Sequence, residues 1–408
     1  MNVNDIRKEF AILDRTVYGK PLVYLDNAAT SQRPRRVVEA WTDSVEKANA
    51  NLHRAVHKLA VDATDAYEAT RDRMRAFLNA ANREEIIFTS GATAAINLVA
   101  FSFGEAFVSE GDEILVSEAE HHSNIVPWQM LCQRKKAVLK VLPVLENGEL
   151  AIEELERLLS LRTKIVAITH ISNVLGIINP VQEIISVCHA KGVPVLVDGA
   201  QGIVHQRVDV QELGCDFYAF SGHKVYAATG TGVLYGKREW LEKMPPYMGG
   251  GEMIETVRFS GTTYAPLPGK FEAGTQNINA VPTLAVAADL QDSFLESVEL
   301  IEYQKNIRNI ILDSLAADPR IKLYGLPRNR EDKIPLFSFA VAGAHHEDLA
   351  LLLDKMGIAV RSGQMCAEPL MDRLGVTGLL RASFAPYNTM EEAEYFVQCL
   401  NRAISMLV

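Results

Sequence analysis

The central part of this chain alternates short apolar segments with longer amphipathic ones, and this alternation constrains the fold more than any other feature of the sequence. Segments rich in Val, Ile and Leu are predicted strands, at 86–90, 114–117, 138–144, 165–171 and 193–198. The predicted helices before and between them lie at 61–81, 92–107, 123–135, 151–160 and 180–191. Strands that alternate with helices indicate an α/β fold whose mostly parallel sheet, of seven-stranded type, is covered on both faces.

The pattern changes after about residue 290. A long predicted helix over 283–317 is followed by a loop rich in Pro and Arg (324–335), a strand, a helix, a short strand and a final helix beginning near Thr389. We therefore expect a large domain over 23–282. A smaller α+β domain would combine 1–22 with 283–408.

Composition excludes several classes of protein. With 408 residues, 48% hydrophobic and 23% charged, the chain can form a large core. The net charge of -10, with no basic block, argues against nucleic-acid binding. Five cysteines without a CxxC pair argue against a disulfide framework and a Cys-rich metal site. A charged N-terminus, and no apolar run near 18 residues, predict a cytoplasmic protein without a membrane segment.

Polar residues follow four of these predicted strands and a fifth apolar segment, DFYAFSGH (216–223). Ligands of open α/β sheets bind at the carboxyl ends of the strands, so these residues are candidates for a site. They are Thr93, His121, Asn173, Asp198, Gln201 and Lys224.

Asp198 and Lys224 together match what pyridoxal phosphate requires. A lysine amine can form a Schiff base with the cofactor aldehyde, and a carboxylate can keep the pyridine nitrogen protonated. Alone, Asp198 would be interpreted as a helix cap and Lys224 as a solvated loop lysine. Ser221 and His223 beside the lysine favour the cofactor interpretation.

Two further segments fit a cofactor that has a phosphate and an aromatic ring. SGATAAIN (90–97) is a glycine turn that opens a helix, where free amides and the Thr93 hydroxyl can bind phosphate. His121 is either a stacking face for an aromatic ring or a surface histidine. The adjacent pair His121–His122 suggests no metal, because consecutive loop residues rarely chelate together and no acid–His framework accompanies them.

The chain resembles the cysteine desulfurases over nearly its whole length. The strings that carry the resemblance, in the family's order, are YLDNAAT (24–30), NANLHRAVH (49–57), EHHSNIVPWQ (120–129), THISNVLG (169–176), VDGAQG (197–202), FSGHKVYAATGTGVLYG (220–236), FEAGTQN (271–277) and RSGQMCAEPL (361–370). The short RSGxxCA loop resembles the group II branch, the SUF-system and sulfinate desulfinase type, which overlaps selenocysteine lyases.

The resemblance implies a role for each matching residue. Lys224 would hold the cofactor and Asp198 would contact its pyridine nitrogen, while His121 stacks on the ring and Gln201 meets the phenolic oxygen. The phosphate would be held by Thr93, Ser221, His223 and, from the neighbouring subunit of a homodimer, Thr275. Asn173 and Arg381 would bind the substrate carboxylate, with Arg361 as a further substrate-binding residue.

Cys366 would accept sulfur from L-cysteine as a persulfide, leaving L-alanine. Arg361 is a candidate to favour its thiolate, and the following Pro369 predicts an exposed loop. Gln364 and Met365 stand where relatives often carry His-His or Gln-His, so a possible proton carrier is absent. The glycine turn reads GATAAIN (91–97), whereas relatives often carry GTTEAIN there.

The resemblance also implies partners and leaves alternatives. The short cysteine loop predicts that a SufE- or SufU-like acceptor protein docks to collect sulfur for iron–sulfur cluster assembly. L-Selenocysteine is an alternative substrate, which would make the enzyme a selenocysteine lyase. A lyase or epimerase of the same branch would not depend on Cys366. A non-catalytic scaffold for sulfur assembly would be expected to lack Lys224, Asp198 or Cys366, and all three are present.

Overall fold

A seven-stranded sheet forms the centre of the molecule in the computed structural model, which describes residues 2–53 and 56–408. Arg54 and Ala55, within the NANLHRAVH string, lie outside the described residues. In spatial order the strands are β4 (Ile86–Thr89), β10 (Gly232–Gly236), β9 (Phe217–Ser221), β8 (Val195–Asp198), β7 (Thr163–Thr169), β5 (Glu113–Ser117) and β6 (Val138–Leu142).

The sheet is mostly parallel, as predicted. β9, β8, β7, β5 and β6 pair in parallel, whereas β10 runs antiparallel to both β9 and β4. β4 therefore points the same way as the parallel strands, and the carboxyl ends of all strands except β10 meet at one edge. Apart from the partly exposed edge strand β6, the strands are buried on both faces, which explains their runs of Val, Ile and Leu.

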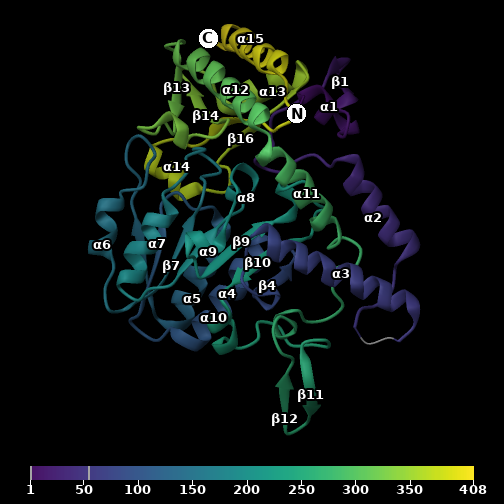
Figure 1. Cartoon of the computed structure of the whole chain (residues 1–408). Coiled ribbons are helices and arrows are strands. Elements are labelled where there is room, and N and C mark those ends of the chain that lie inside the picture. The colour runs from purple at the N-terminus through teal and green to yellow at the C-terminus, as the bar shows by residue number, and fades with distance from the viewer. Residues whose placement is uncertain (1, 54–55) are drawn as a thin grey trace.

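Helices cover both faces of this sheet (Figure 1). The predicted helix 92–107 forms with those bounds, and the predicted 180–191 differs by one residue at each end. The prediction for 151–160 is wrong in length, because only a 3-10 turn (Ile152–Glu154) and one short helix form there. The helices of this part are α2 (Arg35–Lys47), α3 (Lys58–Phe77), α4 (Ala92–Phe107), α5 (Val126–Lys135), α6 (Leu155–Leu158), α7 (Val181–Ala190), α8 (Gly202–His205), α9 (Val210–Leu213) and α10 (Arg238–Lys243).

A second, antiparallel sheet has its own core. Its order is β13 (Ile321–Tyr324), β14 (Leu336–Val341), β17 (Leu379–Ser383) and β16 (Arg361–Gly363). Phe337, Phe339 and Leu380 lie in an apolar cluster with residues of the flanking helices. Those helices are α12 (Val298–Ala316), α13 (His346–Lys355) and α15 (Met390–Leu407), whereas the buried residues of α14 (Glu368–Leu374) belong to the core of the large sheet.

The predicted helix over 283–317 is interrupted at Ser297. α11 (Thr283–Glu296) ends there, and α12 begins at Val298 with the Ser297 side chain accepting a hydrogen bond from the Leu300 N–H. Serine is a strong N-cap and a modest helix former, so it favours a new start over a continuous helix.

Segments near the N-terminus contact the second sheet region. β3 (Val23–Tyr24) pairs in parallel with β15 (Ile358–Ala359). Arg7, in α1 (Val3–Arg7), forms an ion pair with Glu392 and donates to the Tyr387 carbonyl. The division of the chain into 23–282 and 1–22 plus 283–408 stays a prediction.

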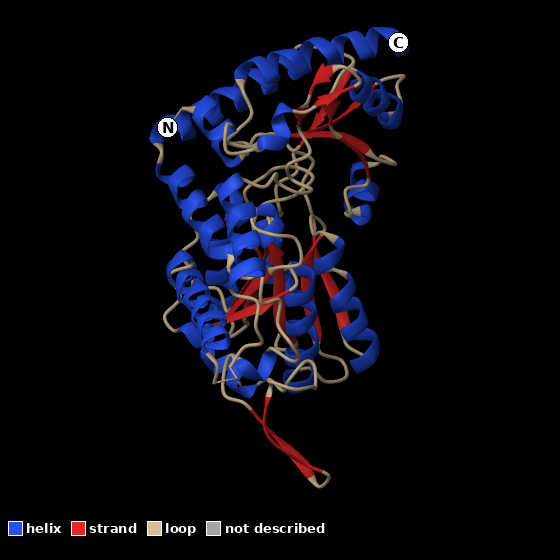
Figure 2. Cartoon of the chain, turned by 90° about the vertical axis from the view of Figure 1, so that its right-hand side faces the viewer, coloured by secondary structure: helices blue, strands red, loops and turns tan. Residues whose placement is uncertain are grey.

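The smaller sheet and a long hairpin lie at opposite ends of the molecule (Figures 1 and 2). The hairpin consists of β11 (Ile254–Arg258) and β12 (Gly261–Tyr264), and two further short strands, β1 (Thr16–Val17) and β2 (Lys20–Pro21), pair near the N-terminus. Within residues 2–53 and 56–408, no helix combines the length and apolar character needed to cross a membrane.

Candidate active site

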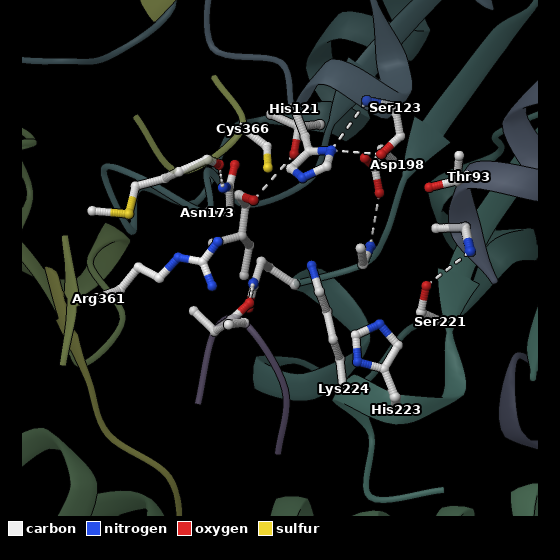
Figure 3. Close-up of a pocket in the computed structure, with 18 of the residues that line it drawn as sticks. Thr93, His121, Ser123, Asn173, Asp198, Ser221, His223, Lys224, Arg361 and Cys366 are labelled. Carbon is white, nitrogen blue, oxygen red and sulfur yellow. Dashed lines mark hydrogen bonds between the residues drawn. The ribbon is translucent and has the colours of Figure 1, made fainter. Parts of the chain in front are cut away.

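One cavity of about 220 Å³ lies where the carboxyl edge of the large sheet meets the smaller sheet (Figure 3). It brings together the predicted site residues with the exception of Thr275, which is exposed in the loop before α11. Those that line it are Thr93, His121, Asn173, Asp198, Gln201, Ser221, His223, Lys224, Arg361, Cys366 and Arg381.

Lys224 and Asp198 follow adjacent parallel strands, so their side chains meet in the cavity. Asp198 ends β8 and is almost wholly buried, with Oδ1 accepting a hydrogen bond from the Ala200 N–H at 3.0 Å. Burial raises the pKa of Asp198, and the Lys224 ammonium opposes that rise. The surrounding protein removes water from Lys224, which lowers the pKa of its amine although Asp198 counteracts this. The pair thus joins a carboxylate to an amine that loses its proton more readily than usual.

His121 lines the same cavity in a fixed orientation. Its Nδ1 accepts the Ser123 N–H at 3.1 Å and lies 2.5 Å from the Ser123 hydroxyl. Burial lowers the pKa of His121 to about 3, and the charge of Lys224 adds to the effect. The imidazole is therefore neutral at pH 7, and the accepting Nδ1 leaves its proton on Nε2.

A glycine turn and two hydroxyls form one end of the cavity. Gly91 precedes α4 at φ +150°, and a Cβ there would lie 3.1 Å from the Ser221 Oγ. Ser221 accepts the Ala92 N–H at 2.8 Å, which fixes the start of α4 beside Thr93. This helix start, with its amides and hydroxyls, is suited to binding a phosphate.

Two other predicted residues are tied to neighbouring loops. His223 lies with Nδ1 3.2 Å from the Thr30 Oγ1, and burial lowers its pKa to about 4. Gln201 is buried and donates from Nε2 to the Ala28 carbonyl at 2.8 Å. Both contacts reach YLDNAAT, which explains how that N-terminal string belongs to the site.

Arg381 comes from β17 of the smaller sheet and is 2% exposed. It donates from Nη1 to the Asn173 carbonyl at 2.8 Å and from Nη2 to Asp26 Oδ1 at 2.9 Å. Its Nε is buried without a hydrogen-bond partner among the described residues. Since a buried donor without a partner is costly, this nitrogen favours an anionic ligand in the cavity.

Cys366 lies between β16 and α14 and is exposed, as the sequence predicted, whereas the other four cysteines are buried. Met365 and Cys366 both have φ +55°. Asn173 donates from Nδ2 to the Met365 carbonyl at 2.9 Å. Asn173, predicted to bind substrate carboxylate, therefore also contacts the cysteine loop.

Sequence reasoning missed three residues around the cavity. Asp26 pairs with Arg381 and lies 3.9 Å from Arg361 Nη1, and its place in YLDNAAT was a usable signal. Glu120 is buried beneath His121 and accepts hydrogen bonds from Ser117, Asn124 and the Thr169 N–H; its burial raises the pKa to about 8.

His122 is the third, and it was considered only as a metal ligand. Its backbone N–H contacts the Cys366 carbonyl, and its ring contacts Glu368 at the start of α14. Nothing in the sequence places residue 122 beside residue 366.

Comparison with known proteins gives matches over the whole chain. The aminotransferase class-V family matches residues 23–396. A probable cysteine desulfurase of Halalkalibacterium halodurans is 49% identical over 403 residues, covering 98% of each chain. A cysteine desulfurase of Escherichia coli is 45% identical over 407 residues, covering 100% of this chain and 99% of the relative.

Solved structures agree with these matches. The cysteine desulfurase CsdA (S-sulfonic acid) from Escherichia coli is similar with a TM-score of 0.91 and 40% identity, over 100% of both chains. The apo cysteine desulfurase from Thermococcus onnurineus has a TM-score of 0.93 and 35% identity, covering 100% of this chain and 99% of its own.

Proposed function

This chain belongs to the aminotransferase class-V family, and from that premise we propose that it is a cysteine desulfurase that uses pyridoxal phosphate. One observation carries the proposal: a desolvated lysine amine, a buried carboxylate and an exposed thiol face the same cavity. The names of the relatives support the activity, and the family is dependent on pyridoxal phosphate.

The residues of the cavity fit this cofactor. Lys224 would hold it covalently, Asp198 would face its ring nitrogen, and His121 would lie on the ring. The Gly91 turn, where a Cβ would crowd Ser221, leaves room for the phosphate beside Thr93, and His223 and Gln201 would complete the set. Bound there, pyridoxal phosphate would supply an electron-accepting ring that weakens bonds at the substrate Cα.

The protein's own groups then have separate tasks. Arg381 and Asn173 would bind the carboxylate of L-cysteine, with the unpartnered Nε of Arg381 as a further donor. Arg361 lies at the same wall. The Lys224 amine, whose pKa is lowered by burial, would accept the Cα proton at Nζ. His121, neutral with its proton on Nε2, would move a proton near the leaving sulfur.

Sulfur transfer would take place on Cys366. Its thiolate would attack the substrate sulfur, so that the Cβ–S bond breaks and an S–S bond forms. L-Cysteine and the Cys366 thiol give L-alanine and a Cys366 persulfide: the sulfurs are oxidised, Cβ is reduced, and no external oxidant is needed. Exposure of Cys366 supports this role, because a buried thiol could not pass sulfur onward.

Three finer features belong to the same proposal. The short connection from β16 to α14 supports a group II enzyme that delivers sulfur to a docking SufE- or SufU-like protein for iron–sulfur assembly. Thr275, exposed and outside the cavity, would reach the phosphate site of a second copy in a homodimer. The large domain would comprise residues 23–282, and the small domain would comprise residues 1–22 and 283–408.

Alanine release from L-cysteine by the cofactor-loaded protein tests the proposal, run beside Cys366→Ala. We expect alanine from the wild type and none from the variant. Alanine from both would remove Cys366 from the reaction. Alanine from neither, with the bound-cofactor absorbance intact, would reject L-cysteine and make selenocysteine and cysteine sulfinate the next substrates to test.

A further inference from the structure

The cysteine loop has an unfavourable backbone that other parts of the molecule must hold. Met365 and Cys366 are consecutive non-glycine residues at φ +55°. A residue in this left-handed region costs on the order of 1–3 kcal/mol and persists only when its surroundings fix it. The loop has only four residues, Gln364–Ala367, between β16 and α14.

Two residues from the carboxyl edge of the large sheet contact this loop. Asn173 donates from Nδ2 to the Met365 carbonyl at 2.9 Å. His122 contacts the loop and the helix that follows it: its backbone N–H donates to the Cys366 carbonyl at 2.8 Å, and its Nε2 accepts the Glu368 N–H at 3.0 Å. The imidazole therefore serves as the acceptor for the first residue of α14.

The first turn of α14 and its N-cap residue supply no acceptor of their own for the Glu368 N–H. Ala367, the N-cap residue, has no side chain that can accept a hydrogen bond. Pro369 has no N–H, and the N–H groups of Leu370 and Met371 both reach the Ala367 carbonyl. Among the donors of the first turn, the Glu368 N–H is the one that requires an outside partner, and the ring of His122 supplies it.

We propose that His122 is a positioning residue that holds the Cys366 thiol over the cavity by fixing both the carbonyl of Cys366 and the start of α14. The inference rests on the proposed function, because it gives a role in sulfur transfer to a residue that touches neither cofactor nor substrate. Its neighbour His121 faces the cavity, so two adjacent histidines have different tasks: one faces the cofactor site, and the other holds the thiol that must reach it.

Alkylation of Cys366 provides a readout that needs no turnover. Cys366 is the exposed cysteine of the five, so iodoacetamide should label one site in the folded holoenzyme. His122→Ala removes the ring acceptor but keeps the backbone hydrogen bond. We expect the loop to become mobile and the labelling rate to change severalfold. The kcat for alanine release should fall by about tenfold, the equivalent of about 1.4 kcal/mol, with KM for L-cysteine nearly unchanged.

Two variants make the test specific. His122→Gln places an amide oxygen near the position of Nε2, so it should restore most of the labelling rate and kcat. His345→Ala is the matched control, since the side chain of His345 also accepts an N–H at a helix start, with Nδ1 accepting the Glu347 N–H of α13 at 3.4 Å, and His345 does not line the cavity. It should leave both quantities unchanged.

The proposal would be overturned if labelling and kcat in His122→Ala matched the wild type, or if His345→Ala changed labelling equally. Failure of the proposed function looks different. In that case the wild type would release no alanine, while the labelling rates of the three variants would still report whether His122 holds the loop.

Discussion

The two sides of the cavity are built in opposite ways. On the cofactor side, Asp198 and Lys224 follow central strands of the seven-stranded sheet, where burial shifts both pKa values. On the sulfur side, Cys366 is exposed on a four-residue loop between elements of the smaller structure. The difference follows from the chemistry, because tuning a pKa needs a dry and rigid site, whereas passing sulfur to another protein needs an accessible thiol.

Arg381 and Asn173 join the two sides. Arg381 reaches from the smaller sheet to the Asn173 carbonyl and Asp26, and Asn173 reaches from the large sheet to the Met365 carbonyl. Two neighbouring carbonyls of the Asn173 loop are also held from the smaller sheet region: Ser338 donates to Val174, and Lys333 donates to Leu175. The substrate carboxylate would therefore bind where hydrogen bonds already connect the large-sheet region with the smaller-sheet region.

Lys224→Ala should give the largest effect, because it removes a group on which the cofactor side depends. We expect loss of the bound-cofactor absorbance and a fall in alanine release of about a thousandfold or more. Labelling of Cys366 by iodoacetamide should continue at a rate near that of the apo wild type. A variant that kept both its absorbance and its turnover would contradict the assignment of Lys224.

Arg381→Lys tests the junction between the sides. Lysine keeps the positive charge but lacks the two guanidinium NH2 groups that donate to Asn173 and Asp26. We expect kcat/KM for L-cysteine to fall by about a hundredfold, mainly through KM, since hydrogen bonds to charged groups contribute about 1.5–3 kcal/mol. Steady-state kinetics measure this, with cofactor absorbance as the control. A fall in kcat at constant KM would assign Arg381 to another step.

The loss of stability at low pH should also differ between the two sides, by a smaller effect. His170, buried beside β8, has its pKa lowered to about 4 by burial. The unfolded chain, with an ordinary histidine pKa of about 6.5, therefore binds more protons between these values, and stability falls as pH drops through that window. Between pH 7 and pH 5, the free energy of unfolding of His170→Gln should fall by about 2 kcal/mol less than that of the wild type.

Urea unfolding at the two pH values measures this difference. His345→Gln, at an exposed position in the smaller structure, is the matched control and should follow the wild type. An equal pH dependence in His170→Gln and the wild type would show that this buried histidine does not contribute to acid sensitivity.

Gln364→Ala should give the smallest effect. Gln364 is exposed and its amide contacts Glu368 at 3.2 Å, a contact that water can replace. We expect a change in unfolding free energy below about 0.5 kcal/mol and alanine release within about twofold of the wild type. A large loss would mean that the glutamine, which stands where relatives often carry histidine, has a task in activating the thiol.

The sequence predicted the cofactor side more completely than the sulfur side. Strand periodicity places Asp198, Lys224 and Asn173 at one edge, because the ends of parallel strands meet there. The exposure of Cys366 follows from its polar neighbours and Pro369. The contacts of His122 with Cys366 and of Arg381 with Asp26 join residues more than 200 positions apart, and no local pattern encodes such contacts.

The helix break at Ser297 and the role of His122 were missed for different reasons. The break at Ser297 was hidden by a helical pattern that continues on both sides of it, so only the capping contact reveals it. His122 was considered for metal binding alone, because a helix cap supplied from another part of the chain has no sequence signature.

Mass analysis of Cys366 after one turnover tests the central claim most directly. The cofactor-loaded protein is mixed with L-cysteine, without reductant or acceptor, trapped by alkylation and digested. The account predicts that the peptide carrying Cys366 gains the mass of one sulfur atom in an amount equal to the alanine released, and that Cys366→Ser gives neither product. Alanine formed in stoichiometric amount while Cys366 stays unmodified would contradict it.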